Sequence, residues 1–232
     1  SLGFTRLDAS VAWKIQDRGI RLDFELDRIV NADLDGMAEG WIDLPNAGPP
    51  QVDIRAHLRH GEATAVYRYL PHKVSGNAYE WLKDSLRGGH SDDVRLTLKG
   101  ALERFPFDQG GGTFNIAINM VDGVLDYAPD WPRITNIRGK LVFHDKAMPL
   151  EATSGNILAT RIGPVRVVIP DLVHTHDEIV LIDGRAQGET RAFLDFIRQS
   201  PVHGYTDGFT ETFKATGDGE LAIRLRLPVR NL

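Results

Sequence analysis

Apolar and polar residues alternate without a fault along residues 20–26 of this chain. Ile20, Leu22, Phe24 and Leu26 fall on one side of an extended backbone, and charged residues occupy the positions between them. This period of two is typical of an antiparallel strand with one apolar and one solvated face. The same alternation predicts strands over residues 52–58, 94–99, 114–120 and 220–228.

Weaker strand patterns fill much of the remaining chain. They lie at residues 41–44, 150–153, 157–162, 165–169 and 178–186. A hairpin-like turn is predicted at residues 121–124, where Asp122 and Gly123 have the composition of a tight turn. The chain therefore contains about ten to twelve strand candidates, most of them with one apolar face.

Two short segments have helical spacing instead of alternation. Residues 78–86 place apolar side chains on one helical face, and the glycines at 88–89 are expected to end that helix. Residues 190–199 form a second apolar cluster, which Pro201 stops. Because each helix precedes a glycine-containing loop and an alternating strand, the pattern indicates a loose internal repeat.

These helices are too few to cover so many apolar strand faces. A helix of ten residues is about 15 Å long and about 10 Å wide, so it covers about two strands spaced about 4.8 Å apart. The other faces must pack on each other or meet another apolar material. We predict a mainly β fold: a large curled antiparallel sheet, groove-like or arranged as an open barrel or sandwich, with two short helices. Residue patterns alone favour a closed, dry core.

Residues 1–232 are expected to form a single β-rich segment of a larger protein. Its sub-modules are predicted at residues 1–66 (N-terminal strands), 67–187 (helix plus sheet) and 188–232 (the start of a second helix-plus-strand repeat). The chain opens with Ser1 rather than methionine, and it has no signal peptide and no apolar run of the roughly 18 residues that span a membrane. We therefore expect an excised piece, with any membrane anchor elsewhere.

Charge and composition exclude several classes of partner and chemistry. The net charge is −5 and acidic and basic residues are interspersed, which argues against a nucleic-acid interface, because such an interface needs a clustered basic face. Cysteine is absent, so thiol catalysis and thiolate metal sites are excluded. The hydrophobic fraction of 42% is sufficient for a core.

No group of residues has the spacing of an active site. His174 and His176 are the best metal candidates, but no third ligand stands at a recognisable spacing, so a polar turn is the favoured interpretation. The chain lacks the Gly-x-Ser-x-Gly elbow of hydrolases, and the glycines at 110–112 lack the Gly-Lys ending of a phosphate loop. We predict no catalytic residue, no metal site and no cofactor.

Aromatic side chains gather in the first helical region. Tyr67, Tyr69, Tyr79 and Trp81 have the composition of a carbohydrate cleft. Packing in a core or at a corner is the favoured interpretation, since buried Tyr and Trp side chains usually serve that purpose.

Residues 125–143 have the pattern of a strand end, a rigid aromatic turn and a new strand. Pro129 and Pro132 each lack an N–H group and fix φ, which excludes a helix and a central strand. Tyr127 and Trp131 place large apolar surfaces on this stiff corner. We expect the corner to hold one strand against another and to take no part in chemistry.

A series of short motifs between residues 67 and 232 resembles one known family. The most specific is Asp-Tyr-Ala-Pro-x-Trp-Pro at residues 126–132. It is accompanied, in order along the chain, by Tyr-Leu-Pro at 69–71, Trp-Leu at 81–82, Phe-Pro-Phe at 105–107, Ile-Pro-Asp-Leu at 169–172 and Ser-Pro at 200–201. In these motifs the chain resembles the central region of the YhdP family, which belongs to the AsmA-like group of large bacterial envelope proteins.

The resemblance implies a protein that is anchored in the inner membrane and projects into the periplasm. It also implies a long curled sheet, without catalytic residues, whose concave apolar groove carries phospholipid between the inner and outer membranes. The implied partners are phospholipid acyl chains, neighbouring segments of the full-length protein and the inner membrane, through an anchor that this chain lacks. The resemblance reverses the preference for a closed core, because an open groove explains the excess of one-sided strands.

We therefore predict a non-enzymatic segment of a periplasmic lipid-transport bridge, in which acyl chains lie in an apolar trough and headgroups stay in water. The candidate lipid-binding residues come from the strict alternations and are Ile20, Leu22, Phe24, Leu26, Val94, Leu96, Leu98, Phe114, Ile116 and Ile118. One alternative is a closed-core scaffolding module that docks envelope proteins through exposed strand edges. A second alternative is an unrecognised carbohydrate-active enzyme.

Overall fold

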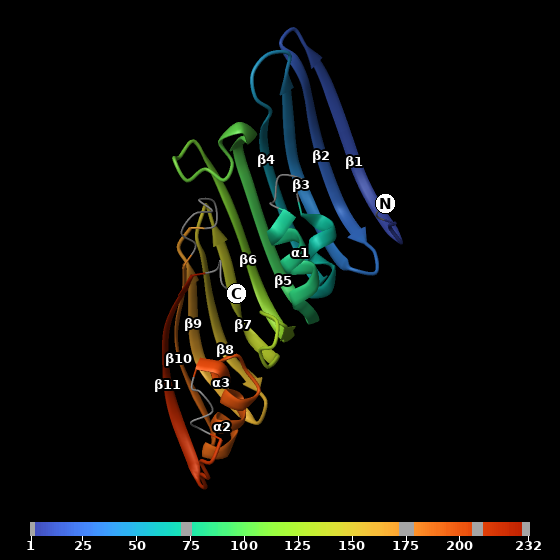
Figure 1. The fold of residues 1–232 in the computed structure, drawn as a ribbon. Coiled ribbons are helices and arrows are strands. Elements are labelled where there is room, and N and C mark those ends of the chain that lie inside the picture. The colour runs from blue at the N-terminus through green and yellow to red at the C-terminus, as the bar shows by residue number, and fades with distance from the viewer. Residues whose placement is uncertain (1–2, 71–75, 172–178, 206–210, 229–232) are drawn as a thin grey trace.

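The described part of the chain folds into one open, eleven-stranded antiparallel sheet, as a computed structural model shows. The structure describes residues 3–70, 76–171, 179–205 and 211–228. Every strand pairs with its neighbours in the sequence, so the strand order is β1 to β11 without a crossover. Figure 1 shows the strands side by side in a twisted sheet, with β1 at one edge and β11 at the other. The predicted fold class is confirmed.

The strands are long for a sheet of this kind, because each prolongs the alternation that its central residues show in the sequence. Their bounds are β1 Arg6–Gln16, β2 Gly19–Val30, β3 Leu34–Pro45, β4 Gln51–Glu62, β5 Leu86–Ala101, β6 Gly112–Leu125, β7 Ile134–His144, β8 Met148–Ile157, β9 Thr160–Ile169, β10 Ile179–Glu189 and β11 Asp218–Pro228.

Helical segments interrupt this meander at two main places. Between β4 and β5 lie the 3-10 helix η1 (Ala63–Tyr69) and the helix α1 (Gly76–Ser85), and between β10 and β11 lie α2 (Thr190–Arg198) and α3 (Val202–Tyr205). A single 3-10 turn, η2 (Leu102–Arg104), follows β5. Both main helical segments lie against the same side of the sheet, near one end of the strands (Figure 1).

Two local predictions are wrong because a bulge or a turn lies elsewhere. Residues 121–124 form no hairpin, because β6 runs through them to Leu125. The pairing of β6 with β7 instead shifts its register between Met120 and Gly123, where Asp122 has a positive φ of 51°. Residues 157–162 form no single strand, since β8 ends and β9 begins there, with Leu158 at a positive φ of 50° in the turn.

The glycines at 88–89 also do not end a helix. The helix α1 ends at Ser85, and both glycines lie inside β5. Gly89 has a φ of 101°, and an added Cβ would lie 2.6 Å from the Cα of Gly123 on β6. The glycine is therefore required where two backbones approach closely in an irregular part of the ladder.

The closed, dry core that residue patterns alone favoured is wrong. The described strands form a single sheet, and nothing in the described part of the chain makes a second sheet against it. Buried apolar side chains are few and mostly small in these residues: Val52, Ala63, Ala65, Phe107, Ala186 and Ala192. A chain of this length with an ordinary core buries many large side chains, so this sheet leaves one face open.

Candidate functional site

An unbroken row of apolar residues crosses all eleven strands. Residues that pair directly in an antiparallel ladder place their side chains on the same face of the sheet. Starting from β1, each residue of the row pairs with the next, and the only member without a side chain is Gly36. The row consists of Leu7, Ile29, Gly36, Leu58, Val94, Ile118, Leu141, Leu150, Val167, Ile182 and Leu225. We call the side of the sheet that carries it the apolar face.

All candidate lipid-binding residues lie on this face. Val94 and Ile118 belong to the row itself. The others lie in parallel rows, of which three connect β2 to the central strands: Leu22–Ile42–Val52–Gly100, Phe24–Gly40–Ile54–Leu98–Phe114 and Leu26–Ala38–Ala56–Leu96–Ile116. Ile20 pairs with Ile15 and Leu44 near the end of the strands. The register thus brings together residues that are almost a hundred positions apart in the sequence.

Sequence reasoning missed much of the same face. On β1, Leu7, Val11, Trp13 and Ile15 alternate with polar or small residues, and this signal was sufficient to find the strand. The alternation of β11 predicts a strand, but none of the candidate lipid-binding residues lies on it. The sequence shows less clearly which residues of β7, β8 and β9 lie on the apolar face, because bulges shift the register of β7.

The apolar face is uncovered over most of its width. Trp13 is 67% and Ile15 is 81% exposed on β1, and Leu225 is 45% exposed on β11 at the other edge. On the central strands β5 and β6, the large apolar side chains of this face are half-buried. Each large apolar side chain left in water forgoes about 1.5–3 kcal/mol, so a face of this extent favours an apolar occupant.

The opposite face is polar and charged. A row of Asn119, Lys140, Glu151, Arg166, Asp183 and Arg224 crosses the sheet from β6 to β11. Cross-strand ion pairs lie on it, such as Lys99 Nζ to Asp53 Oδ2 at 3.2 Å and Arg224 Nε to Asp183 Oδ2 at 3.2 Å. The sheet therefore presents one mainly charged face and one apolar face, with apolar exceptions such as Met37, Trp41 and Leu181 on the charged face.

Aromatic residues fasten the helical segments to the sheet. The Tyr67 and Tyr79 rings pack edge to face at 5.7 Å, and the Tyr69 hydroxyl donates to Asp33 at 3.1 Å. Trp81 donates its Nε1–H to the carbonyl of Tyr127 at 3.1 Å. These side chains, the candidates for a carbohydrate cleft, thus make structural contacts with each other and with turns of the sheet.

The corner between β6 and β7 lies between the two helical segments. Trp131 packs at 5.9 Å from both Tyr127 and Phe196, the latter on α2. Burial raises the pKa of Tyr127 to about 12. The corner therefore lies between two strands, as its sequence predicts, and it also contacts α2 through Phe196, which the sequence does not predict.

Charged groups form ion-pair networks rather than a reactive cluster. Arg133 donates to both oxygens of Asp126 at 2.5 and 2.7 Å and Arg87 donates to the same carboxylate at 3.3 Å, and these bonds hold the pKa of Asp126 below its usual value. Arg95 and His57 lower the pKa of Asp93 in the same way. Within the described ranges, no three metal-ligating side chains are placed to share an ion. The candidates His174 and His176 lie outside those ranges.

The helices of the described segments are all too short or too polar to cross a lipid bilayer. The longest is α1, with ten residues. A spanning helix needs about 20 predominantly apolar residues.

Comparison with known proteins gives one family and one curated relative. A family model described as "YhdP protein" matches residues 1–231. The intermembrane phospholipid transporter YhdP of Escherichia coli (strain K12) is 23% identical to this chain over 227 residues. That alignment covers 95% of the chain and 17% of the relative, so the chain spans a small part of that protein. No solved structure matches the chain significantly.

Proposed function

Because this chain belongs to the YhdP family, we propose that it is a segment of a protein that carries phospholipid between the two membranes of a bacterial envelope. The relative that it matches is a phospholipid transporter by name. The single observation that supports the proposal for this segment is the apolar row that runs from β1 to β11 without interruption.

The dimensions of the apolar face suit acyl chains. Ten steps between strands at about 4.8 Å give a row about 48 Å long. The hydrocarbon of one leaflet is about 15 Å deep, half of the roughly 30 Å core of a bilayer. The row is thus about three times as long as a lipid tail, which fits a path along which several lipids follow one another.

An acyl chain is also the right chemistry for this surface. It demands no hydrogen bond, so it covers half-buried leucine, isoleucine and valine side chains without competing for the paired backbone of the sheet. Each methylene that leaves water contributes about 0.8 kcal/mol. The charged headgroup stays in water. The mechanism is passive solvation in a trough that is lined by the candidate residues, and it requires no catalytic group.

The partners and the location follow from the same proposal. Neighbouring segments of the full-length protein extend the sheet at its two edges, and the whole protein is tethered to the inner membrane by an anchor and projects into the periplasm. The exposed apolar side chains of β1 and β11 support the first statement, because the face continues to both edges of the sheet. The division into sub-modules at residues 1–66, 67–187 and 188–232 stays a prediction.

Mass spectrometry of an organic extract of the purified chain tests the proposal. We expect phospholipid to co-purify in stoichiometric amounts and to be removed by the extraction. A clean extract, together with a mass in light scattering that rises with concentration, would point to a scaffolding module that docks through its strand edges. Release of reducing sugar from envelope glycans would point to an enzyme.

A further inference from the structure

The two ends of the strands differ in what they carry. At one end lie the described connections at residues 31–33, 63–70, 76–85, 126–133, 158–159, 190–205 and 211–217, which include the helices α1, α2 and α3. We call this end the helical rim. The opposite rim consists of the described connections at residues 17–18, 46–50, 102–111, 145–147 and 170–171.

At the helical rim, η1, α1, the β6–β7 corner and α2 contact one another in series. We call this series of contacts the wall of the apolar face. Arg68 and Tyr69 of η1 bind Asp33 in the turn between β2 and β3 at 3.0 and 3.1 Å. Trp81 of α1 then binds the β6–β7 corner, and Trp131 of that corner contacts Phe196 of α2. Because the Tyr67 and Tyr79 rings join η1 to α1, the contacts pass from the β2–β3 turn to α2.

The wall at α2 stands over the apolar face. Gly188 and Gly219 pair with each other two residues beyond the pair of Ala186 and Leu221, so both glycines lie on that face. A Cβ on Gly219 would lie 3.1 Å from the ring of Phe193, which places this α2 side chain directly above the sheet. Thr190 fixes the start of the helix through two bonds to the carbonyl of Gly217, both 2.9 Å long.

The opposite rim is open by comparison. Among its described connections, the β5–β6 loop folds two aromatic side chains onto the apolar face. Phe107 is buried against Gly100 and Gly112, and the ring of Phe105 lies 4.8 Å from that of Phe114. The other described connections are short turns rich in charged and small residues, such as Asp17-Arg18 and residues 46–50. In its described connections this rim carries only the single turn η2, whereas η1, α1, α2 and α3 lie at the helical rim.

We propose, on the premise that the apolar face binds phospholipid, that each bound lipid lies parallel to the strands, with its acyl ends against the helical rim and its headgroup at the opposite rim. A strand of 11 or 12 residues is about 36–40 Å long, and a helix about 10–12 Å wide covers one end. About 25 Å remain open. One lipid, taken as half of a bilayer of about 40–45 Å, is about 20–22 Å long and fits this width. Transport then moves the lipid sideways from strand to strand.

Single-tryptophan variants loaded from dioleoylphosphatidylcholine vesicles test this orientation. Trp13→Phe, Trp41→Phe and Trp81→Phe together leave Trp131 as the probe of the helical rim. Adding Trp131→Phe and Phe105→Trp moves the probe to the opposite rim, and Leu44→Trp replaces Phe105→Trp if that variant does not fold. The vesicles carry a nitroxide either at the end of an acyl chain or on the headgroup.

We expect the chain-end nitroxide to cause the larger loss of Trp131 emission and the headgroup nitroxide to cause the larger loss at position 105 or 44. Equal loss at both rims would mean that lipids lie along the row, and a reversed gradient would mean the opposite polarity; either overturns the inference. Bound lipid is measured by phosphate assay in the same samples. If no lipid is bound, the proposed function itself fails, whereas bound lipid without a gradient removes the orientation alone.

Discussion

At the scale of single residues, the two faces of one strand require side chains of opposite polarity. On β5, Leu96 and Leu98 point to the apolar face and pair with apolar residues on both sides, while Thr97 between them pairs with Arg55 and Asn115 on the polar face. A charged side chain at position 96 or 98 therefore costs desolvation free energy only if an apolar molecule covers it. This difference allows a matched comparison within three consecutive residues.

The Leu96→Asp and Leu98→Asp double variant should lose bound phospholipid, because two carboxylates in the middle of the face would have to be desolvated by every acyl chain that passes. The control is Thr97→Asp, which places the same charge on the solvated face. Lipid phosphate per purified chain is the measurement, and circular dichroism checks the fold. A folded double variant that retains as much lipid as Thr97→Asp would show that these leucines do not line a lipid site.

Asp126 makes a prediction about pH. Its pKa is lowered in the folded chain by Arg133 and Arg87, so the carboxylate contributes stability above the unfolded pKa of about 3.9 and loses it as pH falls through the folded value. Asp126→Asn should therefore cost about 1 kcal/mol at pH 7, a modest value because the group is partly exposed. Below about pH 4 the difference in free energy of unfolding from the unsubstituted chain should shrink.

Urea titrations of both chains between pH 3 and 7 measure this difference. Asp130→Asn in the same corner is a suitable control. A constant difference across the pH range would show that Asp126 acts through packing and not through its charge.

At the scale of elements, the helices depend on the sheet as much as on their own sequences. The helix α2 is nine residues long, which is marginal for an isolated helix, and its bonds to Gly217 and its contact with Trp131 tie it to β11 and to the β6–β7 corner. The motif that carries the most specific family resemblance thus supports a helix that follows it by about sixty residues. This role was invisible from the sequence, because no local pattern connects the two.

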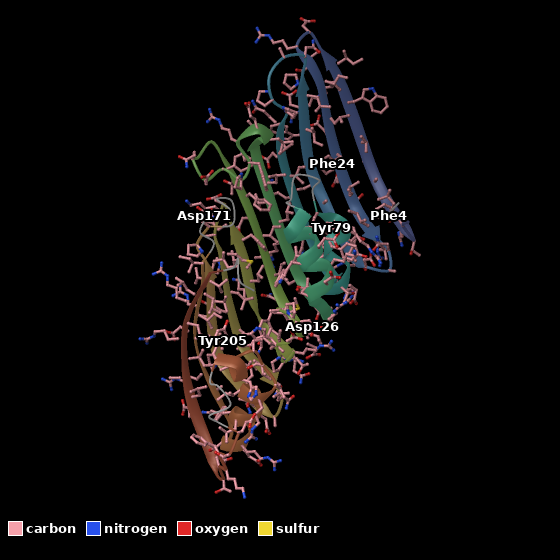
Figure 2. The ribbon with its side chains drawn as sticks, in the orientation of Figure 1. Phe4, Phe24, Tyr79, Asp126, Asp171 and Tyr205 are labelled. Carbon is pink, nitrogen blue, oxygen red and sulfur yellow. The ribbon has the colours of Figure 1, made fainter. Side chains whose placement is uncertain are left out.

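A double-mutant cycle measures that connection. Trp131→Ala and Phe196→Ala should each destabilise the chain, and their effects should be coupled by about 0.5–1.5 kcal/mol, as for other aromatic pairs in contact. The control cycle combines Trp131→Ala with Phe4→Ala, a residue beside the edge strand β1 (Figure 2), and its two effects should be additive. Denaturation followed by circular dichroism gives the four free energies of unfolding. Additive effects of Trp131 and Phe196 would contradict the contact.

At the scale of the whole molecule, each strand contributes one residue to the apolar row in the same way. Val167 on β9 pairs with Leu150 and Ile182, just as Val94 on β5 pairs with Leu58 and Ile118. If lipids follow one another along the row, an obstacle anywhere on it blocks the same path. The N-terminal and C-terminal halves of the sheet should therefore be equally sensitive to a charge.

Val167→Asp should decrease the bound phospholipid per chain, although none of the candidate residues lies on β9. Its neighbour Arg166 faces the polar side, where it pairs with Glu151 and Asp183, so Arg166→Asp tests for a general effect of charge on this strand. The lipid phosphate assay compares the two variants. Unchanged lipid in a folded Val167→Asp chain would restrict the lipid path to the strands before β9.

The sequence by itself determined which residues share a face within one strand, because alternation is a local property of an extended backbone. It also determined the family, through the motifs around Trp131, and the excess of one-sided strands over helices. Only the tertiary structure decided that the apolar faces of all eleven strands join into one. That result depends on register, which turns and bulges such as the shift between Asp35 and Gly36 set: a slip of one residue would turn a whole strand over.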